Sequence, residues 1–184
     1  MIISYEFIQQ HVSLTWTEAV WGIEKNLIDW SFLKDMAVTR LCDGVEGPLE
    51  IEIAGLTIEN SDDAVSLAKN LAKNEIGNAE SEPLKKWLYI VLLDLFEKNK
   101  SIDDALSTIE CIYADFGYPE EIESFVKYMP VNNNYNPLKH SYDENISRLY
   151  NNWRQYLVRS AELYTIQSAI ACTSSPAREK KSPE

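Results

Sequence analysis

The sequence predicts an all-α protein: a single compact multi-helix domain with a long C-terminal helix and a disordered tail. Apolar residues recur every three or four positions through most of the 184 residues, which is the period of an amphipathic helix. Residues that start and end helices bracket these stretches. No pair of strand-like segments occurs, and one strand cannot satisfy its own backbone hydrogen bonds. We expect the helical domain to span residues 1–172 and the tail to span residues 173–184.

The first half of the chain is expected to hold four helices. A capping box that begins at Thr15 starts the first, and Ser31 lies near the start of the second. Residues 48–58 alternate apolar and acidic side chains like a strand, but their apolar residues also fit a helical stripe, and we favour a short helix. Ser61 is expected to cap the fourth helix and Gly77 to end it.

The stretch from residue 83 to about residue 98 is apolar on nearly every face, which predicts a helix at the centre of the fold. Pro83 suits its first turn, where the missing N–H costs nothing. Asp94 interrupts the apolar run. We expect this carboxylate to be buried and paired with an arginine or a backbone group rather than to bind a metal.

Two further helical segments meet at a Gly-Tyr-Pro corner. Ser101 caps the first of them, and Gly117 suits the left-handed position that follows a helix end. Proline restricts the residue before it, so we expect an extended Tyr118 and a new helix from Pro119 to about Met129.

A capping box at Ser141 and Glu144 opens the last and longest helix. The apolar stripes of the later helices are expected to face the interior. Their members include Ile102, Leu163 and Ile170.

Charge and composition narrow the range of functions. The net charge is −12 at pH 7, and so acidic a surface repels nucleic acid and anionic membranes and attracts basic partners. The N-terminal residues lack a secretory pattern, and no apolar run is long enough to span a bilayer. We therefore expect a cytoplasmic protein that binds neither nucleic acid nor membranes. Its three widely spaced cysteines are expected to be reduced, with two of them buried.

Motifs for catalysis and for cofactor binding are missing from the sequence. The two histidines, His11 and His140, stand in no Ser-His-Asp or Cys-His pattern. Glycine-rich phosphate loops and the usual spacings of metal ligands are also missing. We expect no catalytic, cofactor-binding or metal-binding residue, and therefore no enzyme.

The most unusual segment, residues 112–130, reads IYADFGYPEEIESFVKYMP and places acidic residues beside aromatic ones. One interpretation is structural: acids in a first helical turn suit the helix dipole, and Glu123 can pair with Lys127 four residues later. The other is a docking surface for a basic protein. Its candidate contact residues are Asp115, Tyr118, Glu120, Glu121 and Glu123, and a rival acidic patch consists of Asp43, Glu46, Glu50 and Glu52.

Several blocks of this sequence resemble a bacterial family of uncharacterised helical proteins. The blocks are LTWTEAVWGIEKNLIDW, IEIAGL, KWLYIVLLDLFEKN, IECIYADFGYPEEIESFVKYMP and RLYNNWRQYL, and the resemblance covers about residues 5–160. Members of that family recur beside polymorphic toxin genes, including contact-dependent growth inhibition systems, where they resemble immunity proteins. Some pair with toxins of the EndoU-type RNase class. The family has no established catalytic motif, so no catalytic residue carries over.

The resemblance implies an immunity protein that neutralises a cognate toxin, a basic nuclease, by occluding its substrate groove. The residues leave two alternatives open. One is a non-catalytic helical adaptor or regulator whose acidic surface serves solubility. The other is a carboxylate metal hydrolase, which we rank last because so few histidines are present.

Overall fold

The computed structural model describes residues 2–75, 82–131 and 135–173, with side chains as far as Tyr164 in the last range. Every regular element in these ranges is an α-helix or a 3-10 helix, which confirms the all-α prediction. The elements are α1 Tyr5–His11, α2 Trp16–Glu24, α3 Trp30–Cys42, α4 Pro48–Ala54, η1 Ile58–Asn60, α5 Asp63–Asn74, α6 Pro83–Lys98, α7 Ile102–Asp115, η3 Glu120–Phe125, η4 Pro137–Lys139 and α8 Tyr142–Thr173.

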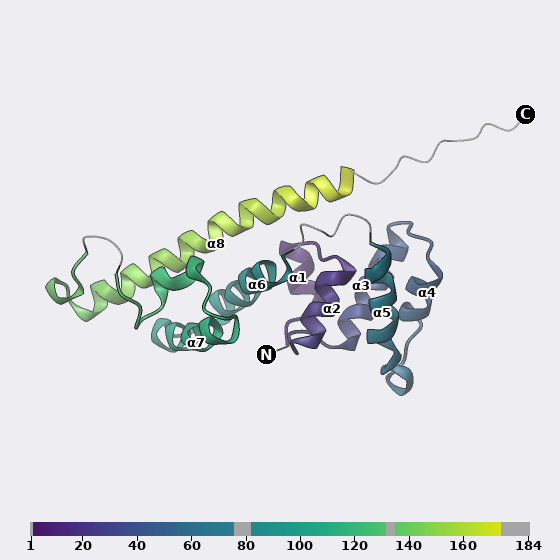
Figure 1. The fold of residues 1–184 in the computed structure, drawn as a ribbon, viewed down its shortest axis with the longest axis horizontal. Helices are drawn as coiled ribbons and strands as arrows, with labels where there is room; N and C mark the ends of the chain where they lie inside the picture. The colour runs from purple at the N-terminus through teal and green to yellow at the C-terminus, as the bar shows by residue number, and fades with distance from the viewer. Residues whose placement is uncertain (1, 76–81, 132–134, 174–184) are drawn as a thin grey trace, which may run out of the picture.

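Helix α6 connects the two ends of an elongated molecule. Figure 1 shows α1 to α5 gathered at one end, α7 and η3 at the other, and the long helix α8 lying along the second group and over α6. Contacts from α6 reach α2, α7 and α8. The helix is buried on every face, as predicted for a central element, through Lys86, Trp87, Leu88, Tyr89, Ile90, Val91, Leu92 and Asp94.

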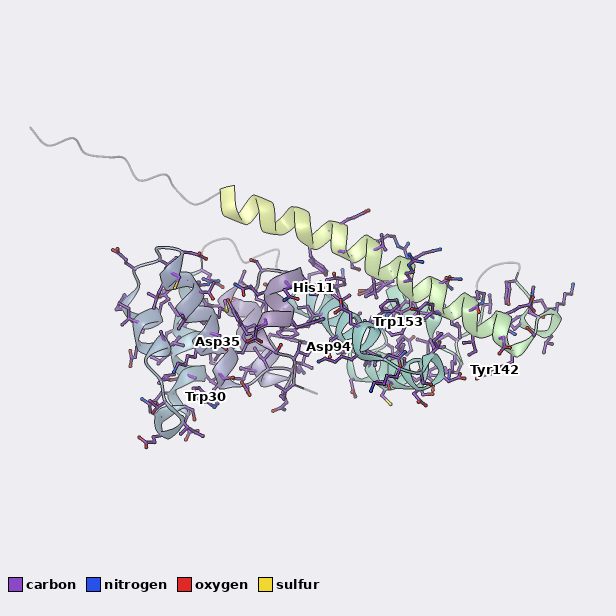
Figure 2. The ribbon with its side chains drawn as sticks, turned by 180° about the vertical axis from the view of Figure 1, so that it is seen from behind. His11, Trp30, Asp35, Asp94, Tyr142 and Trp153 are labelled. Carbon is purple, nitrogen blue, oxygen red and sulfur yellow. The ribbon has the colours of Figure 1, made fainter. Side chains whose placement is uncertain are left out.

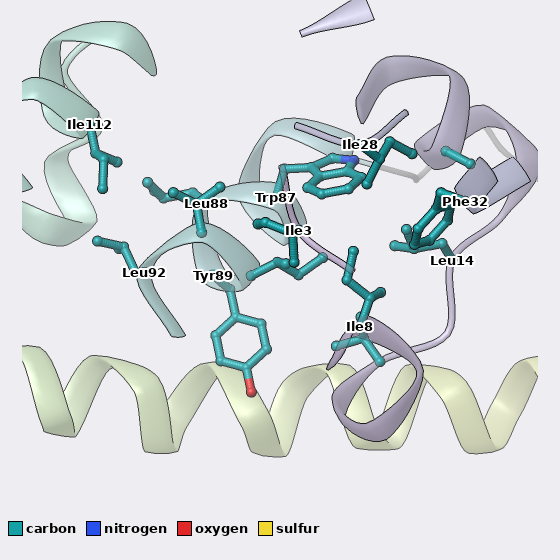
Figure 3. Close-up of a cluster of buried hydrophobic side chains, with 14 of the residues drawn as sticks. Ile3, Ile8, Leu14, Ile28, Phe32, Trp87, Leu88, Tyr89, Leu92 and Ile112 are labelled. Carbon is teal, nitrogen blue, oxygen red and sulfur yellow. The ribbon is translucent and has the colours of Figure 1, made fainter. Parts of the chain in front are cut away.

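The core joins the two ends of the molecule around α6. Figure 3 shows Trp87 beside Ile28, which lies between α2 and α3, and the Tyr89 hydroxyl pointing toward α8. The Tyr89 ring lies 5.3 Å from the ring of Tyr164 on α8. The Trp87 indole donates a 2.8 Å hydrogen bond to the carbonyl oxygen of Glu18 on α2. A buried tryptophan therefore has its polar atom satisfied while its ring fills the centre.

Local capping residues start most helices where the sequence predicts. The capping boxes at Thr15 and Ser141 are present, and the Ser101 side chain caps α7. Residues 48–54 are helical, as favoured above. Two starts differ: Asp29, rather than Ser31, caps α3, and α5 begins at Asp63.

A tertiary contact adds a second cap to α2. Glu75, just after α5, accepts hydrogen bonds from the backbone N–H groups of Trp16 at 2.7 Å and Thr17 at 3.0 Å. These are among the N–H groups that a helix leaves without internal partners. The carboxylate lies near the positive end of the helix dipole, and it fixes α5 against α2.

Helix α1 is an element that the sequence analysis did not predict. It has seven residues and buries one of them, Ile8. Two turns with one buried side chain are too short to show a helical period. The helix is instead held by its tertiary surroundings, including a 2.8 Å hydrogen bond from the N–H of Ile3 to the carbonyl oxygen of Leu27.

Some inward-facing predictions are wrong. Ile102 and Leu163 are exposed, and the side chain of Ile170 lies outside the described residues. Asp94 is fully buried, as expected, and lies near the middle of the long axis of the molecule (Figure 2). Its partner is Lys98, one turn later, at 2.5 Å, rather than an arginine or a backbone group.

Two predicted features fall partly or wholly outside the described residues. Gly77, the predicted end of the fourth helix, lies in an undescribed segment, and so do residues 174–184 of the predicted tail. Thr173 is the last residue of α8. Within the described ranges, no helix combines the length and apolar character needed to cross a bilayer.

Candidate partner-binding surface

The corner after α7 contains two successive residues in the left-handed region, Gly117 at φ 77° and Tyr118 at φ 62°. The Tyr118 N–H donates to the Tyr113 carbonyl oxygen at 2.8 Å, and the Gly117 N–H donates to that of Ala114 at 3.1 Å. This pair of bonds is the Schellman motif that ends many helices. The predicted extended conformation of Tyr118 is wrong, because its φ of 62° lies in the left-handed region, although the motif needs that conformation only at Gly117. A left-handed tyrosine costs about 1–2 kcal/mol, so its surroundings must hold it there.

Three tyrosines form a cluster at this corner, which we call the tyrosine cluster: Tyr113, Tyr118 and Tyr128. Tyr113 is buried, whereas Tyr118 and Tyr128 are 61% and 57% exposed. The Tyr118 ring stands edge-on to that of Tyr113 with centroids 5.2 Å apart, and the Tyr128 ring lies 6.2 Å from it. Two exposed aromatic rings thus share one buried support.

Carboxylates border the tyrosine cluster. The Tyr113 hydroxyl donates a 3.0 Å hydrogen bond to Glu123 Oε1. Burial, and then this bond and charge, raise the pKa of Tyr113 to about 12. Burial, followed by the nearby Tyr118 and Glu110, raises the pKa of Tyr128. Among the ion pairs between described residues, none includes Glu110 or Glu123.

The five predicted contact residues lie at the end of α7, in the corner after it and on η3. Tyr118 and Glu123 meet at Tyr113, and Asp115 is exposed at the end of α7. Glu120 and Glu121 are also exposed, on η3. Burial raises the pKa of Tyr164, and the charge of Glu121 is the next cause, so Glu121 lies on the side of η3 that faces α8.

The predicted helix from Pro119 to about Met129 is wrong. The chain forms only the 3-10 helix η3, which ends where Val126 becomes extended at φ −86° and ψ 125°. The predicted pairing of Glu123 with Lys127 is therefore lost. Lys127 Nζ instead lies 3.1 Å from the Asp103 carbonyl oxygen and 3.5 Å from Asp103 Oδ1, so its charge is directed toward the start of α7.

A small cleft of about 170 Å³ lies between η3 and α8, next to the tyrosine cluster. Its lining includes Glu123, Val126, Met129, Arg148 and Asn152. The Asn152 amide holds η3 against α8 through a 2.7 Å hydrogen bond to the Ser124 carbonyl oxygen. Arg148 could not be predicted as a neighbour of this surface, because it comes from α8 and no local sequence pattern connects it with residue 123.

The rival acidic patch is not a continuous surface. Glu50 is buried, and its charge acts on Arg40, whose pKa burial lowers. The Glu50 carboxylate packs against Gly47, since a Cβ on Gly47 would lie 1.8 Å from Glu50 Oε2. Asp43, Glu46 and Glu52 remain exposed.

In the described part of the chain, the histidine and cysteine side chains that catalysis would need are placed like ordinary structural residues. His11 Nδ1 lies 2.8 Å from the Phe7 carbonyl oxygen, and Nε2 lies 3.3 Å from Glu97. No group of three potential metal ligands comes together among the described residues. Cys42 and Cys111 are both exposed and unpaired, so the prediction of two buried cysteines is wrong.

Comparison with known proteins identifies the family. The family model for uncharacterized proteins conserved in bacteria, DUF2247, matches residues 5–161. No curated protein and no solved structure matches the chain. Because the family match spans most of the sequence, the protein belongs to the bacterial DUF2247 family.

Proposed function

We propose that this protein is a cytoplasmic immunity protein. It binds a cognate antibacterial toxin, an RNase, and neutralises it by covering the toxin's basic substrate groove. The observation that carries the proposal is the exposed pair Tyr118 and Tyr128 beside carboxylates that make no ion pair with a described residue. Exposed aromatic side chains on a rigid support are typical anchors of protein interfaces.

Electrostatics suits this role. An RNase must present positive charge to the RNA backbone. A partner with a net charge of −12 is attracted to the same groove, which speeds encounter and excludes the substrate. The resemblance to immunity proteins found beside toxin genes points the same way. Inhibition of this kind requires no chemistry from the immunity protein.

Two matched charge reversals test the surface. Asp115 and Glu52 are both exposed acids, one at the end of α7 and one in the rival patch. Asp115→Lys and Glu52→Lys change the net charge equally. The full-length protein and each variant are co-expressed with the toxin domain encoded by the neighbouring gene, and growth and binding affinity are measured.

We expect the wild-type protein to restore growth and Glu52→Lys to keep this effect. Asp115→Lys is expected to weaken binding about tenfold or more, because it places a positive charge against a basic groove. Loss of protection with Glu52→Lys alone would move the interface to the rival patch. A neighbouring toxin that kills cells equally with and without this protein would remove the proposal.

A further inference from the structure

The tyrosine cluster offers two exposed ring surfaces that are already held in place. Tyr118 stands edge-on to Tyr113, and two backbone hydrogen bonds fix the left-handed corner that carries it. Tyr128 packs on the same buried ring from the segment after η3. Binding of a partner to these rings therefore costs little side-chain entropy, because Tyr118 and Tyr128 are already held in place.

Negative charge lies next to the rings, and no ion pair between described residues includes Glu110 or Glu123. Glu123 accepts from the Tyr113 hydroxyl, and Glu110 is close enough to Tyr128 to act on it. Lys127, the neighbour of Tyr128 in sequence, is held by Asp103 and Ser107. Arg148, on the wall of the adjacent cleft, lies over the Tyr135 ring at 4.8 Å.

We infer that the tyrosine cluster, with Glu110 and Glu123, is a recognition site for an arginine side chain of the partner protein. A planar guanidinium stacks on a tyrosine face and donates paired hydrogen bonds to a carboxylate, so one side chain satisfies both features. A lysine ammonium supplies the charge without the flat surface or the paired donors. Phosphate groups are repelled by the same carboxylates. The inference rests on the proposed function only in taking the arginine to belong to a basic toxin.

The test uses the full-length protein and three labelled probes: hexa-arginine, hexa-lysine and hexa-citrulline peptides. Citrulline keeps the shape of arginine without its charge. Binding is followed by fluorescence anisotropy at low ionic strength, where surface electrostatics are strongest. We expect hexa-arginine to bind about tenfold more tightly than hexa-lysine, and hexa-citrulline not to bind.

Variants locate the site. Tyr118→Leu and Tyr128→Leu remove a ring and are each expected to weaken hexa-arginine binding about tenfold, whereas the matched Phe variants keep the ring and stay near the wild-type affinity. Glu123→Gln keeps an acceptor for Tyr113 but loses its charge, and we expect a similar weakening. The control is Leu138→Ala, which shortens an exposed side chain on η4, outside the cluster.

Equal binding of hexa-arginine and hexa-lysine, or unchanged affinity in both Leu variants, would overturn the inference. The two proposals fail separately. If the cluster binds hexa-arginine but the neighbouring toxin is not neutralised, the arginine site stands and the immunity function falls. If the toxin is neutralised but the Leu variants bind hexa-arginine normally, the function stands and the arginine site falls.

Discussion

The Tyr113 hydroxyl donates a 3.0 Å hydrogen bond to Glu123 Oε1, which joins the end of α7 to η3 across the corner at Gly117. Tyr113 also supports both exposed rings of the tyrosine cluster. One buried phenol thus holds together the backbone corner, the aromatic surface and one of its carboxylates. The arrangement makes Tyr113 a structural residue of the surface rather than a contact residue.

Tyr113 is expected to make stability depend on alkaline pH. Its pKa is raised from 10.0 to about 12, by burial and then by Glu123, so the folded protein keeps a proton that the unfolded chain releases. The stabilisation is complete below pH 10 and is lost as the pH rises from 10 through 12. Tyr113→Phe removes this linkage. Urea unfolding at about pH 8 and about pH 11 should show a smaller stability difference between wild type and variant at the higher pH. An equal difference at both values would contradict the prediction.

Lys86 and Glu18 form a buried ion pair between α6 and α2. The two charged groups lie 2.6 Å apart with side chains 11% and 4% exposed, and Lys86 Nζ also donates to the Ser13 carbonyl oxygen at 3.3 Å. Lys86→Met leaves the Glu18 carboxylate buried without its cation, so we expect unfolding free energy to fall by about 3 kcal/mol. Lys85→Met is the control, because Lys85 pairs with Glu82 on the surface and its loss should change stability little. If both variants lose the same unfolding free energy in urea, the burial of the Lys86–Glu18 pair does not explain its contribution to stability.

Gly22 lies against the ring of Trp87. A Cβ at Gly22 would be 2.1 Å from Trp87 Cζ2, and the hydrogen bond of Trp87 to Glu18 prevents the ring from moving away freely. Gly22→Ala should therefore cost more than the roughly 1 kcal/mol that alanine gains inside a helix, for a net loss of about 1–2 kcal/mol. Gly55→Ala serves as the control, since its nearest contact is an ordinary 3.5 Å. The prediction fails if both variants unfold at the same urea concentration.

Asp94 is buried, and its ion-pair partner among the described residues is Lys98. Lys98 Nζ lies 2.5 Å from Oδ1, outside hydrogen-bond geometry, and neither carboxylate oxygen makes a hydrogen bond with a described residue. The Lys98 side chain is 61% exposed, so solvent screens the pair, and we expect Lys98→Met to lower the unfolding free energy by only about 1 kcal/mol. Adding Asp94→Asn to this variant removes that charge and should restore much of the loss. A double-mutant cycle measured by thermal unfolding checks this coupling, and additive effects would count against it.

Short-range signals explain the accuracy of the helix predictions. Thr15, Ser101 and Ser141 each cap a helix through a side chain three residues from its target, so the interaction is visible in the sequence. The central position of α6 could be predicted because a helix that is apolar on all sides must be surrounded. The short helix α1 could not be predicted in this way, since the burial of its one inward side chain, Ile8, depends on residues that follow it in the chain.

The candidate surface was only partly predictable. The acidic and aromatic composition of residues 112–130 indicated a candidate surface. The sequence also predicted a helix after Pro119, on which Glu123 would have paired with Lys127. The 3-10 geometry of η3 turns Glu123 toward Tyr113 and leaves Lys127 to Asp103. The direction of each charge depends on the packing of η3 against α7 and α8, which no pattern within the segment records.

The all-helical class, most helix starts and the strongly acidic character could be predicted from the sequence, because caps, apolar periodicity and net charge are properties of neighbouring residues or of simple composition. The packing of the helices determines that Tyr118 and Tyr128 share Tyr113 as a support, and that Glu50 is buried while Glu123 accepts a hydrogen bond from Tyr113. These relationships arise when helices pack and bring together side chains from separate elements. Packing selects which acids and aromatics remain available to a partner, and the linear order of residues does not specify that selection.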